Sequence, residues 1–240
     1  GLPFVNGSSE NVSEWRMFRK YLNHTAWDGV SYSTISGLNR ANFITGDDIG
    51  FSSPAVWNGY VYIGGYDNQT YQLNASNLSQ KIANFSTGDW VHSSPAVWNG
   101  YVYIGSDDNN LYQLNASNVS QKIANFTTGC IGTTEYSSPA VANGYVYVGS
   151  CDKNMYQLNA SNVSQKIANY STGARVDSSP AVANGYVYFG SYDNYVYQLN
   201  ATNISLGNTV VSDTTAPSVY LISHANATTT SNTTQYFVAN

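Results

Sequence analysis

The residues most suited to binding a ligand lie in four short segments, each just before a Ser-Ser-Pro triplet. Their side chains differ from one segment to the next and combine carboxylates with an indole, an imidazole and a guanidinium. An aromatic ring beside carboxylates and Arg suits a sugar or another polar ligand. The alternative interpretation is ordinary variation of loops around a fixed framework. The possible ligand-binding residues are Asp48, Asp89, Trp90, His92, Glu135, Arg175 and Asp177.

Catalytic and metal-binding signatures are missing from the sequence. His24, His92 and His224 fall in unrelated segments without the spacing of zinc ligands. Turns such as Asp67-Asn68 lack the alternating oxygen ligands of a calcium loop, and turn chemistry explains them. The chain contains no G-x-S-x-G, H-E-x-x-H or P-loop motif. The sequence therefore predicts a protein that is not an enzyme and that holds no metal and no cofactor.

Four near-identical repeats would position the four variable segments. Each repeat reads SSPAV-x-NGYVY-x-G and continues to YQLN. The prolines of the four copies are 41, 44 and 41 residues apart, a period typical of four-stranded propeller blades. Those prolines are Pro54, Pro95, Pro139 and Pro180.

Each repeat divides into four short strands. In the first copy, Asn58-Gly59 is a strong signal for a two-residue hairpin. A second turn at Asp67-Asn68 leads to a strand over residues 71–73, and a fourth strand follows around residues 82–85. Pro54 stands at the beginning of the first strand, where proline is tolerated.

The last repeat lacks its fourth strand, and a matching segment stands before the first repeat. Ala41–Thr45 resembles residues 83–87, the fourth strand of the first copy. We therefore predict that Ala41–Thr45 pairs beside Tyr195–Leu199 and closes the ring, because closure removes the unpaired strand edges. The predicted fold is an all-β, four-bladed β-propeller over residues 38–208, closed by an N-terminal strand. Residues 1–37 form a lead-in or connector, and residues 209–240 form a linker and a C-terminal tail of two strands.

The repeats resemble the quinoprotein-type (PQQ-like) β-propeller repeat over about residues 15–205. The segment Trp15-x-Met17-Phe18-Arg19, followed by His24-Thr25, resembles the lead-in found before such repeats. The family includes dehydrogenases that use pyrroloquinoline quinone, and also scaffolds and surface proteins without a cofactor. This chain has four repeats rather than about eight and lacks the adjacent cysteine pair of the dehydrogenases. The resemblance thus implies a non-enzymatic member, and a ring of two chains is the alternative to a four-bladed ring.

The charge content limits the possible partners. Asp, Glu, Lys and Arg make up only 10% of residues, and the net charge is −5. No basic stripe is present for phosphate contacts, so nucleic acid is excluded as a partner. No apolar run approaches the roughly eighteen residues that a membrane span requires.

Seventeen Asn-x-Ser/Thr triplets indicate a secreted glycoprotein at the cell surface. The alternative is that Asn and Ser serve as turn formers and create such triplets by chance. The turns after the third strand of each repeat carry two triplets apiece. The glycosylation candidates are Asn11, Asn23, Asn68, Asn74, Asn77, Asn84, Asn115, Asn118, Asn125, Asn159, Asn162, Asn169, Asn200, Asn203, Asn226 and Asn232.

The tail differs in kind from the repeats. Residues 218–223 and 235–239 are two strand-like runs that resemble the opening of an immunoglobulin-like module of surface proteins. Two strands cannot bury a core alone. Either the chain is cut within a longer protein, or the tail pairs with its own propeller or with another copy. The alternating apolar residues that would make such an assembly contact are Val219, Leu221, Tyr236 and Val238.

The leading functional hypothesis is an extracellular, glycosylated structural propeller that builds a surface layer or filament, with terminal segments linking copies into a homopolymer. The alternative is an adhesin-like propeller that binds carbohydrate or surface proteins through the variable segments. A third interpretation is a fragment of a quinone-dependent dehydrogenase.

We predict a disulfide between Cys130 and Cys151, the two cysteines of the chain. Cys130 lies in a variable segment three residues longer than two of its equivalents, and Cys151 lies in a turn expected on the same face. The bond would close a loop of about twenty residues and contribute roughly 3 kcal/mol in an oxidising compartment. Mass spectrometry of the native protein should find no free thiol, and two free thiols would refute the bond.

Overall fold

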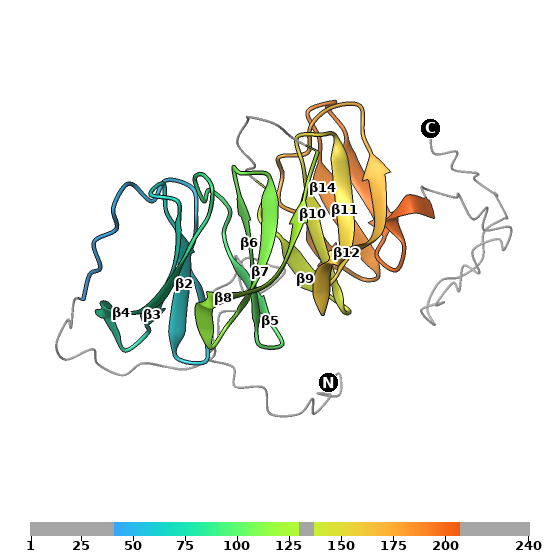
Figure 1. Cartoon of the computed structure of the whole chain (residues 1–240). Coiled ribbons are helices and arrows are strands. Elements are labelled where there is room, and N and C mark those ends of the chain that lie inside the picture. The colour runs from blue at the N-terminus through green and yellow to red at the C-terminus, as the bar shows by residue number, and fades with distance from the viewer. Residues whose placement is uncertain (1–40, 130–136, 207–240) are drawn as a thin grey trace, which may run out of the picture. The chain divides into compact units, whose positions relative to one another are not determined.

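The computed structural model describes residues 41–129 and 137–206, which fold into four antiparallel sheets that we call blades 1 to 4 (Figure 1). Blade 1 holds β1 (Ala55–Trp57), β2 (Tyr60–Gly64), β3 (Gln69–Asn74) and β4 (Asn77–Ser86). Blade 2 holds β5 (Ala96–Trp98), β6 (Tyr101–Ser106), β7 (Asn110–Asn115) and β8 (Asn118–Thr127). Blade 3 holds β9 (Ala140–Ala142), β10 (Tyr145–Gly149), β11 (Asn154–Asn159) and β12 (Asn162–Ser171). Blade 4 holds β13 (Ala181–Ala183), β14 (Tyr186–Gly190) and β15 (Val196–Asn200), followed by the short 3₁₀ helix η1 (Ile204–Leu206).

The predicted all-β class and the four-blade division are confirmed. Within each blade the strands pair with their neighbours in chain order, as successive hairpins. The first hairpin of blade 1 turns at Asn58 and Gly59, whose φ angles are 47° and 77°. Positive φ at both positions defines a type I′ turn, which Asn-Gly adopts readily and which matches the twist of the strands. The same pair of residues makes the equivalent turn in the other three blades.

The core consists of three apolar layers, one between each pair of consecutive blades. The layer between blades 1 and 2 includes Val102, Ile104 and Leu114, all fully buried. Burial of apolar area at these junctions, rather than ion pairing, is the main force that stacks the blades.

A tyrosine and a glutamine in each of the first three blades bind the turn of the next blade. The Tyr62 hydroxyl and the Gln72 amide both donate to the carbonyl of Ala116, at 2.5 and 3.0 Å. Gln72 Oε1 accepts a hydrogen bond from the amide of Val119 at 3.1 Å. These side chains are fully buried, so the bonds replace those that the groups would make with water. The same bonds join Tyr103 and Gln113 to Ala160 and Val163, and Tyr147 and Gln157 to Ala201 and Ile204.

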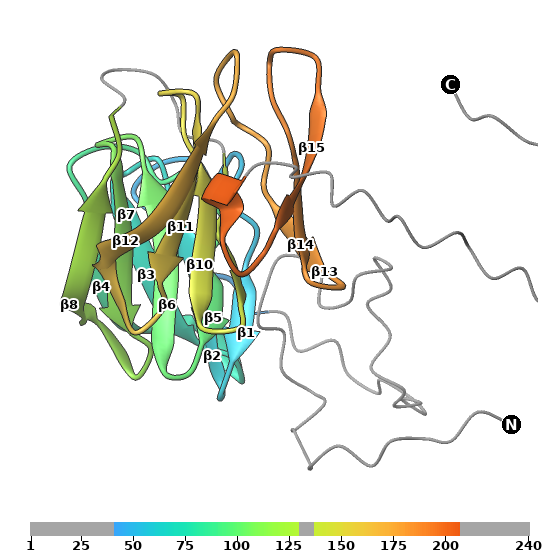
Figure 2. The same cartoon turned by 90° about the vertical axis from the view of Figure 1, so that its right-hand side faces the viewer.

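The predicted pairing of residues 41–45 with the third strand of blade 4 is absent. Residues 41–45 form no strand, and β15 is the edge of a three-stranded sheet (Figure 2). The segment lies instead against blade 1, where the Phe43 ring meets the Tyr71 ring at 5.1 Å. The amide of Gly46 also donates to Asp67 Oδ2 at 2.7 Å. These contacts hold the segment on blade 1, and no described hydrogen bond connects it to blade 4.

Two further expectations lie outside the described residues. They are the lead-in over residues 1–37 and the tail over residues 209–240, with its proposed assembly residues. Within residues 41–129 and 137–206, no helix is long and apolar enough to cross a membrane.

Gln113→Leu should lower the free energy of unfolding by about 1–3 kcal/mol, because it leaves the buried amide of Val163 without its acceptor. The matched control is Gln198→Leu, at the equivalent and exposed position of blade 4, where we expect little change. Urea unfolding in dilute solution measures both variants. Equal losses for the two would contradict the assigned role of the glutamine.

Candidate functional site

An aromatic cluster joins blades 1 and 2 at the variable segments. The Trp90 ring, 45% exposed, stacks on the Tyr66 ring at 5.2 Å with 16° between the planes. His92 lies edge-on to both rings, at 5.6 Å from Trp90 and 4.6 Å from Tyr66. The Phe51 ring lies 5.4 Å from His92. The cluster thus presents an exposed indole on an aromatic base.

The imidazole of this cluster is paired with a carboxylate. His92 is only 3% exposed, and its Nδ1 lies 2.9 Å from both carboxylate oxygens of Asp107. This contact at Nδ1 fixes the orientation of the imidazole ring. The arrangement suits recognition of a flat, polar ligand against the aromatic surface.

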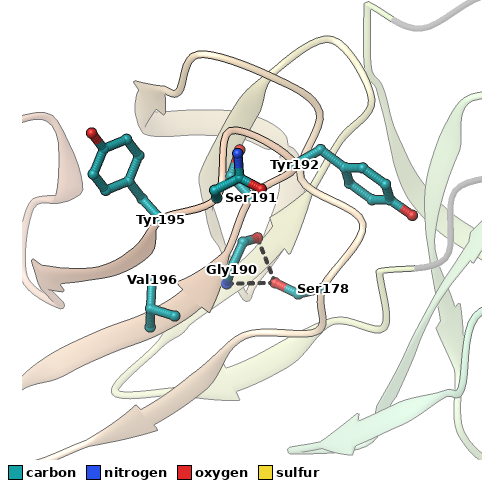
Figure 3. Close-up of a pocket in the computed structure, with 7 residues that line it drawn as sticks. Ser178, Gly190, Ser191, Tyr192, Tyr195 and Val196 are labelled. Atoms are coloured by element: carbon teal, nitrogen blue, oxygen red, sulfur yellow. Dashed lines mark hydrogen bonds between the residues drawn. The ribbon is translucent and has the colours of Figure 1, made fainter.

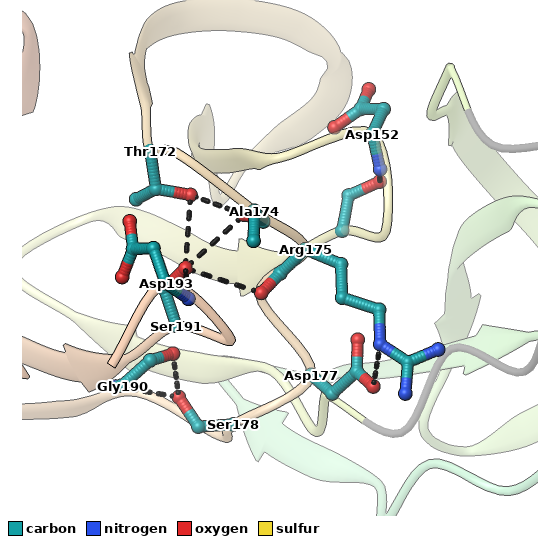
Figure 4. Close-up of polar contacts among 10 residues, drawn as sticks. Asp152, Thr172, Ala174, Arg175, Asp177, Ser178, Gly190, Ser191 and Asp193 are labelled. Atoms are coloured by element: carbon teal, nitrogen blue, oxygen red, sulfur yellow. Dashed lines mark hydrogen bonds and ion pairs between the residues drawn. The ribbon is translucent and has the colours of Figure 1, made fainter. Parts of the chain in front are cut away.

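A second polar group lies between blades 3 and 4 (Figure 4). Arg175 Nε lies 3.1 Å from Asp177 Oδ2, and the Arg175 guanidinium covers the Tyr192 ring at 4.1 Å from its centre. Burial raises the pKa of Asp177 above its usual value, and the positive charge of Arg175 opposes that rise. A cation over an aromatic face stabilises the ring and the cation together.

The structure brings the described ligand-binding candidates together in two separate pairs. Trp90 and His92 meet at one junction, and Arg175 and Asp177 meet at another. The carboxylates of Asp48 and Asp89 are exposed; the Asp89 carboxylate accepts the amide of Trp90 at 2.9 Å. Glu135 lies outside the described residues, as does Cys130, so the disulfide to Cys151 stays a prediction.

Four contributors to these clusters were missed from the sequence. Tyr66, Asp107 and Tyr192 occupy the same place in three blades, directly before the aspartate of the second turn, and Phe51 occupies the place of His92 before Ser-Ser-Pro. This variable position was the available signal, because the residues on both sides of it hardly change between repeats.

A pocket of about 420 Å³ lies beside β14 and β15 in blade 4 (Figure 3). The Ser178 hydroxyl forms its floor and is bonded to the backbone of Gly190, with both N and O at 2.8 Å. The sequence did not predict this pocket. Its lining residues are Ser178, Gly190, Ser191, Tyr192, Asn194, Tyr195 and Val196.

One aspartate per blade ties the turn after β2, or its equivalent, to the preceding chain segment. In blade 3, Asp152 accepts hydrogen bonds from the amide of Gly129 at 2.9 Å and the hydroxyl of Tyr156 at 2.5 Å. Burial raises the pKa of Asp152, but these bonds and others from Asn154 and Ser150 outweigh it, so the pKa lies below its usual value. The equivalent residues are Asp67, Asp108 and Asp193.

Metal chemistry finds no support in the parts of the chain that the structure describes. No group of three or more His, Cys, Asp and Glu side chains there could hold an ion. The described clusters offer stacking, hydrogen bonding and charge, which can contribute to binding.

No protein-family model and no curated protein matches the chain. Solved structures do. BamB from Moraxella catarrhalis is 14% identical and matches over 60% of this chain and 47% of that chain, with a TM-score of 0.54. The quinohemoprotein alcohol dehydrogenase ADHIIG from Pseudomonas putida HK5 is 18% identical over 68% and 34%, with a TM-score of 0.57. The designed Ika4 protein is 13% identical over 65% and 99%, with a TM-score of 0.52.

These similarities show the fold alone, which is a β-propeller. The chain spans less than half the length of BamB and about a third of the dehydrogenase. At identities below 20%, they do not carry the activity of either protein to this chain.

Acid should weaken the fold through Asp152. A carboxyl whose pKa is lower when folded stabilises the protein above its unfolded pKa, and this contribution is lost as the pH falls through the folded pKa. Asp152→Asn should therefore cost about 1–3 kcal/mol at pH 7 and distinctly less at pH 3. Urea unfolding at the two pH values tests this, with the exposed Asp89→Asn as control. The same loss at both pH values would show that the charge of Asp152 is unimportant.

Proposed function

We propose that the chain is an extracellular structural protein, a glycosylated propeller that serves as a repeating unit of a surface layer or filament. The observation that supports this most is the edge strand β15. Val196, its first residue, is 83% exposed, and Tyr195 directly before it is 67% exposed, although the equivalent part of β3 is covered by β4. An exposed apolar strand edge is a surface on which another strand can be added.

The position of the sequon-bearing turns supports the proposed glycosylation. The turn between β3 and β4 lies beside the β1–β2 hairpin, since the amide of Ala75 donates to the carbonyl of Gly59 at 2.9 Å. The turn between β2 and β3 lies at the other end of the blade, where Asn68 accepts the amide of Thr87. Glycans on the first set of turns would leave the variable segments uncovered.

The low charge of the chain fits the same proposal. A surface with 10% charged residues gains little repulsion between copies, so glycans would be the main barrier to unplanned contacts. We also propose that the protein is not an enzyme.

A binding role is the second candidate, and the Trp90 cluster favours it. An exposed indole stacked on Tyr66 resembles the aromatic surface on which a sugar packs, and the buried His92–Asp107 pair supports it. Trp90→Ala should abolish retention on a glycan array if this role is correct. Arg175→Ala, at the other junction, is the matched control and should leave retention unchanged.

The connector role of the tail is tested by deleting residues 213–240. We expect the truncated chain to lose the assemblies that the full chain forms, as seen by negative-stain electron microscopy. Unchanged assemblies would show that the tail does not link the copies.

Glycosylation is tested separately by peptide mapping of material from the native source. We expect sugar on the asparagines of the four turns, for example Asn74 and Asn77 in the first. If every one of these asparagines is bare, turn formation is the better explanation of the triplets.

A further inference from the structure

In blades 1 and 3, a valine of the segment that leads to the next blade packs against a glycine, but no described residue takes this position in blade 4. A Cβ atom on Gly64 would lie 2.3 Å from Val91 Cγ1, and one on Gly149 would lie 2.4 Å from the carbonyl oxygen of Val176. Both valines are fully buried, so these glycines exist to admit the next blade. At the equivalent Gly190, the nearest atom to such a Cβ is the Ser178 hydroxyl, 3.8 Å away. The pocket of Figure 3 is this open space.

Among the described residues, no turn of a following blade meets the hydrogen-bonding groups of this end. Gln72, Gln113 and Gln157 are fully buried under the turn of the next blade, but the equivalent Gln198 is exposed. Its amide lies 3.5 Å from the hydroxyl of Tyr188, the tyrosine that would share the same turn. The end of blade 4 therefore presents a complete receiving surface that no described residue fills.

Blade 1 exposes the groups that fit this surface. Ile49 occupies the position that Val91 and Val176 hold in their repeats. The backbone carbonyls of Trp90 and Arg175, directly before these valines, each accept an amide from the second turn of their blade. The carbonyl of Asp48, directly before Ile49, does the same. Ile49 is 40% exposed, whereas both valines are fully buried.

The turn of blade 1 shows the same difference. Ala75 is exposed and Leu78 half-exposed. Their equivalents in blades 2 to 4 are buried by the preceding blade; these are Ala116 with Val119, Ala160 with Val163, and Ala201 with Ile204.

The N-terminal segment supplies the missing strand in the correct register. In blade 1, Gln69 pairs with Ser86 and Thr70 with Phe85. The repeat places Ile44 opposite Tyr195 and Phe43 opposite Val196 in the same way. Ile44 is 85% exposed in the present position of the segment. The segment can therefore stay on blade 1 and offer its other edge to β15.

We propose that blade 1 of a second copy of this chain docks head to tail on blade 4, with Ile49 in the pocket at Gly190 and residues 41–44 as the outer strand beside β15. The three internal junctions share the same buried hydrogen bonds and packed layers. To bring blade 4 onto blade 1 within one chain, all three must bend, and packed interiors resist such deformation. A second copy meets blade 4 without any change in these junctions.

This contact deepens the self-assembly part of the proposed function and rests on that part alone. It requires neither glycans nor the tail. A head-to-tail contact of this kind generates a ring where the rotation closes and a filament where it does not.

The first test uses two variants of the full chain, each of which blocks one of the two docking surfaces. Gly190→Val fills the pocket at Gly190, and Ile49→Asp places a charge on the side chain that would enter this pocket. Neither position is tightly packed against described residues. By sedimentation velocity, each variant should lose the association of the wild type, and an equimolar mixture should form 1:1 dimers through the one intact pair of ends. Ile123→Asp, an exposed isoleucine on β8, is the control and should associate as the wild type does.

A second test keeps the question answerable if either variant folds poorly, as judged by circular dichroism. A benzophenone amino acid at position 44, in a mixture of ¹⁴N- and ¹⁵N-labelled full chains, should cross-link to residues 195–196 of a chain with the other label. The benzophenone amino acid at position 82, on the outer strand of blade 1, is the control and should give no such product.

Three results would overturn the contact. They are a strictly monomeric wild type, variants that associate like the wild type, and cross-links at 195–196 confined to chains of one label, which would show closure within a single chain. Loss of assembly on deleting residues 213–240, with no effect of Gly190→Val, would support the tail as connector and reject this contact. The opposite pair of results would support this contact and reject the tail.

Discussion

The stack of blades depends on how each blade receives the backbone turn of the next. A turn carbonyl that enters an apolar layer loses its water, and an unpaired carbonyl there is costly. The phenol of Tyr62 and the amide of Gln72 both meet the carbonyl of Ala116, and the glutamine also accepts the amide of Val119. This paired arrangement fixes the position and the direction of the turn, so the apolar side chains of the two blades meet in one register.

The same logic explains how so few charges suffice. The second turns are held by carboxylates that accept amide and phenol hydrogen bonds rather than by ion pairs, as Asp152 does with Gly129 and Tyr156. The effect is reciprocal, because burial and the bond to Asp67 raise the pKa of Tyr71 to about 12. The Tyr71 phenol thus stays a donor throughout the physiological range, and salt has little to screen at this contact.

The fold was accessible from the sequence, because its signals are local and repeated. Asn58-Gly59 determines a turn, and the period of the prolines determines the blade. The match between residues 41–45 and 83–87 led to a wrong pairing with blade 4, because a local match says nothing about whether blade 4 reaches blade 1. The grouping of the ligand-face candidates into two pairs was not accessible from the sequence for a related reason. Trp90 and Arg175 stand at equivalent positions, yet each is oriented by a residue from its own junction, Tyr66 or Tyr192.

The near identity of the junctions also bears on how the chain reaches its native order. Any turn of the type at Ala116 fits any of the Tyr/Gln pairs, so the conserved contacts alone do not distinguish blade 2 from blade 3 as a neighbour of blade 1. Repeat proteins misassemble by exchanging such equivalent elements. The variable segments differ at each junction, with Trp90 on Tyr66 at one and Arg175 on Tyr192 at another. Because these contacts differ between junctions, they distinguish the correct neighbour of each blade from the other blades.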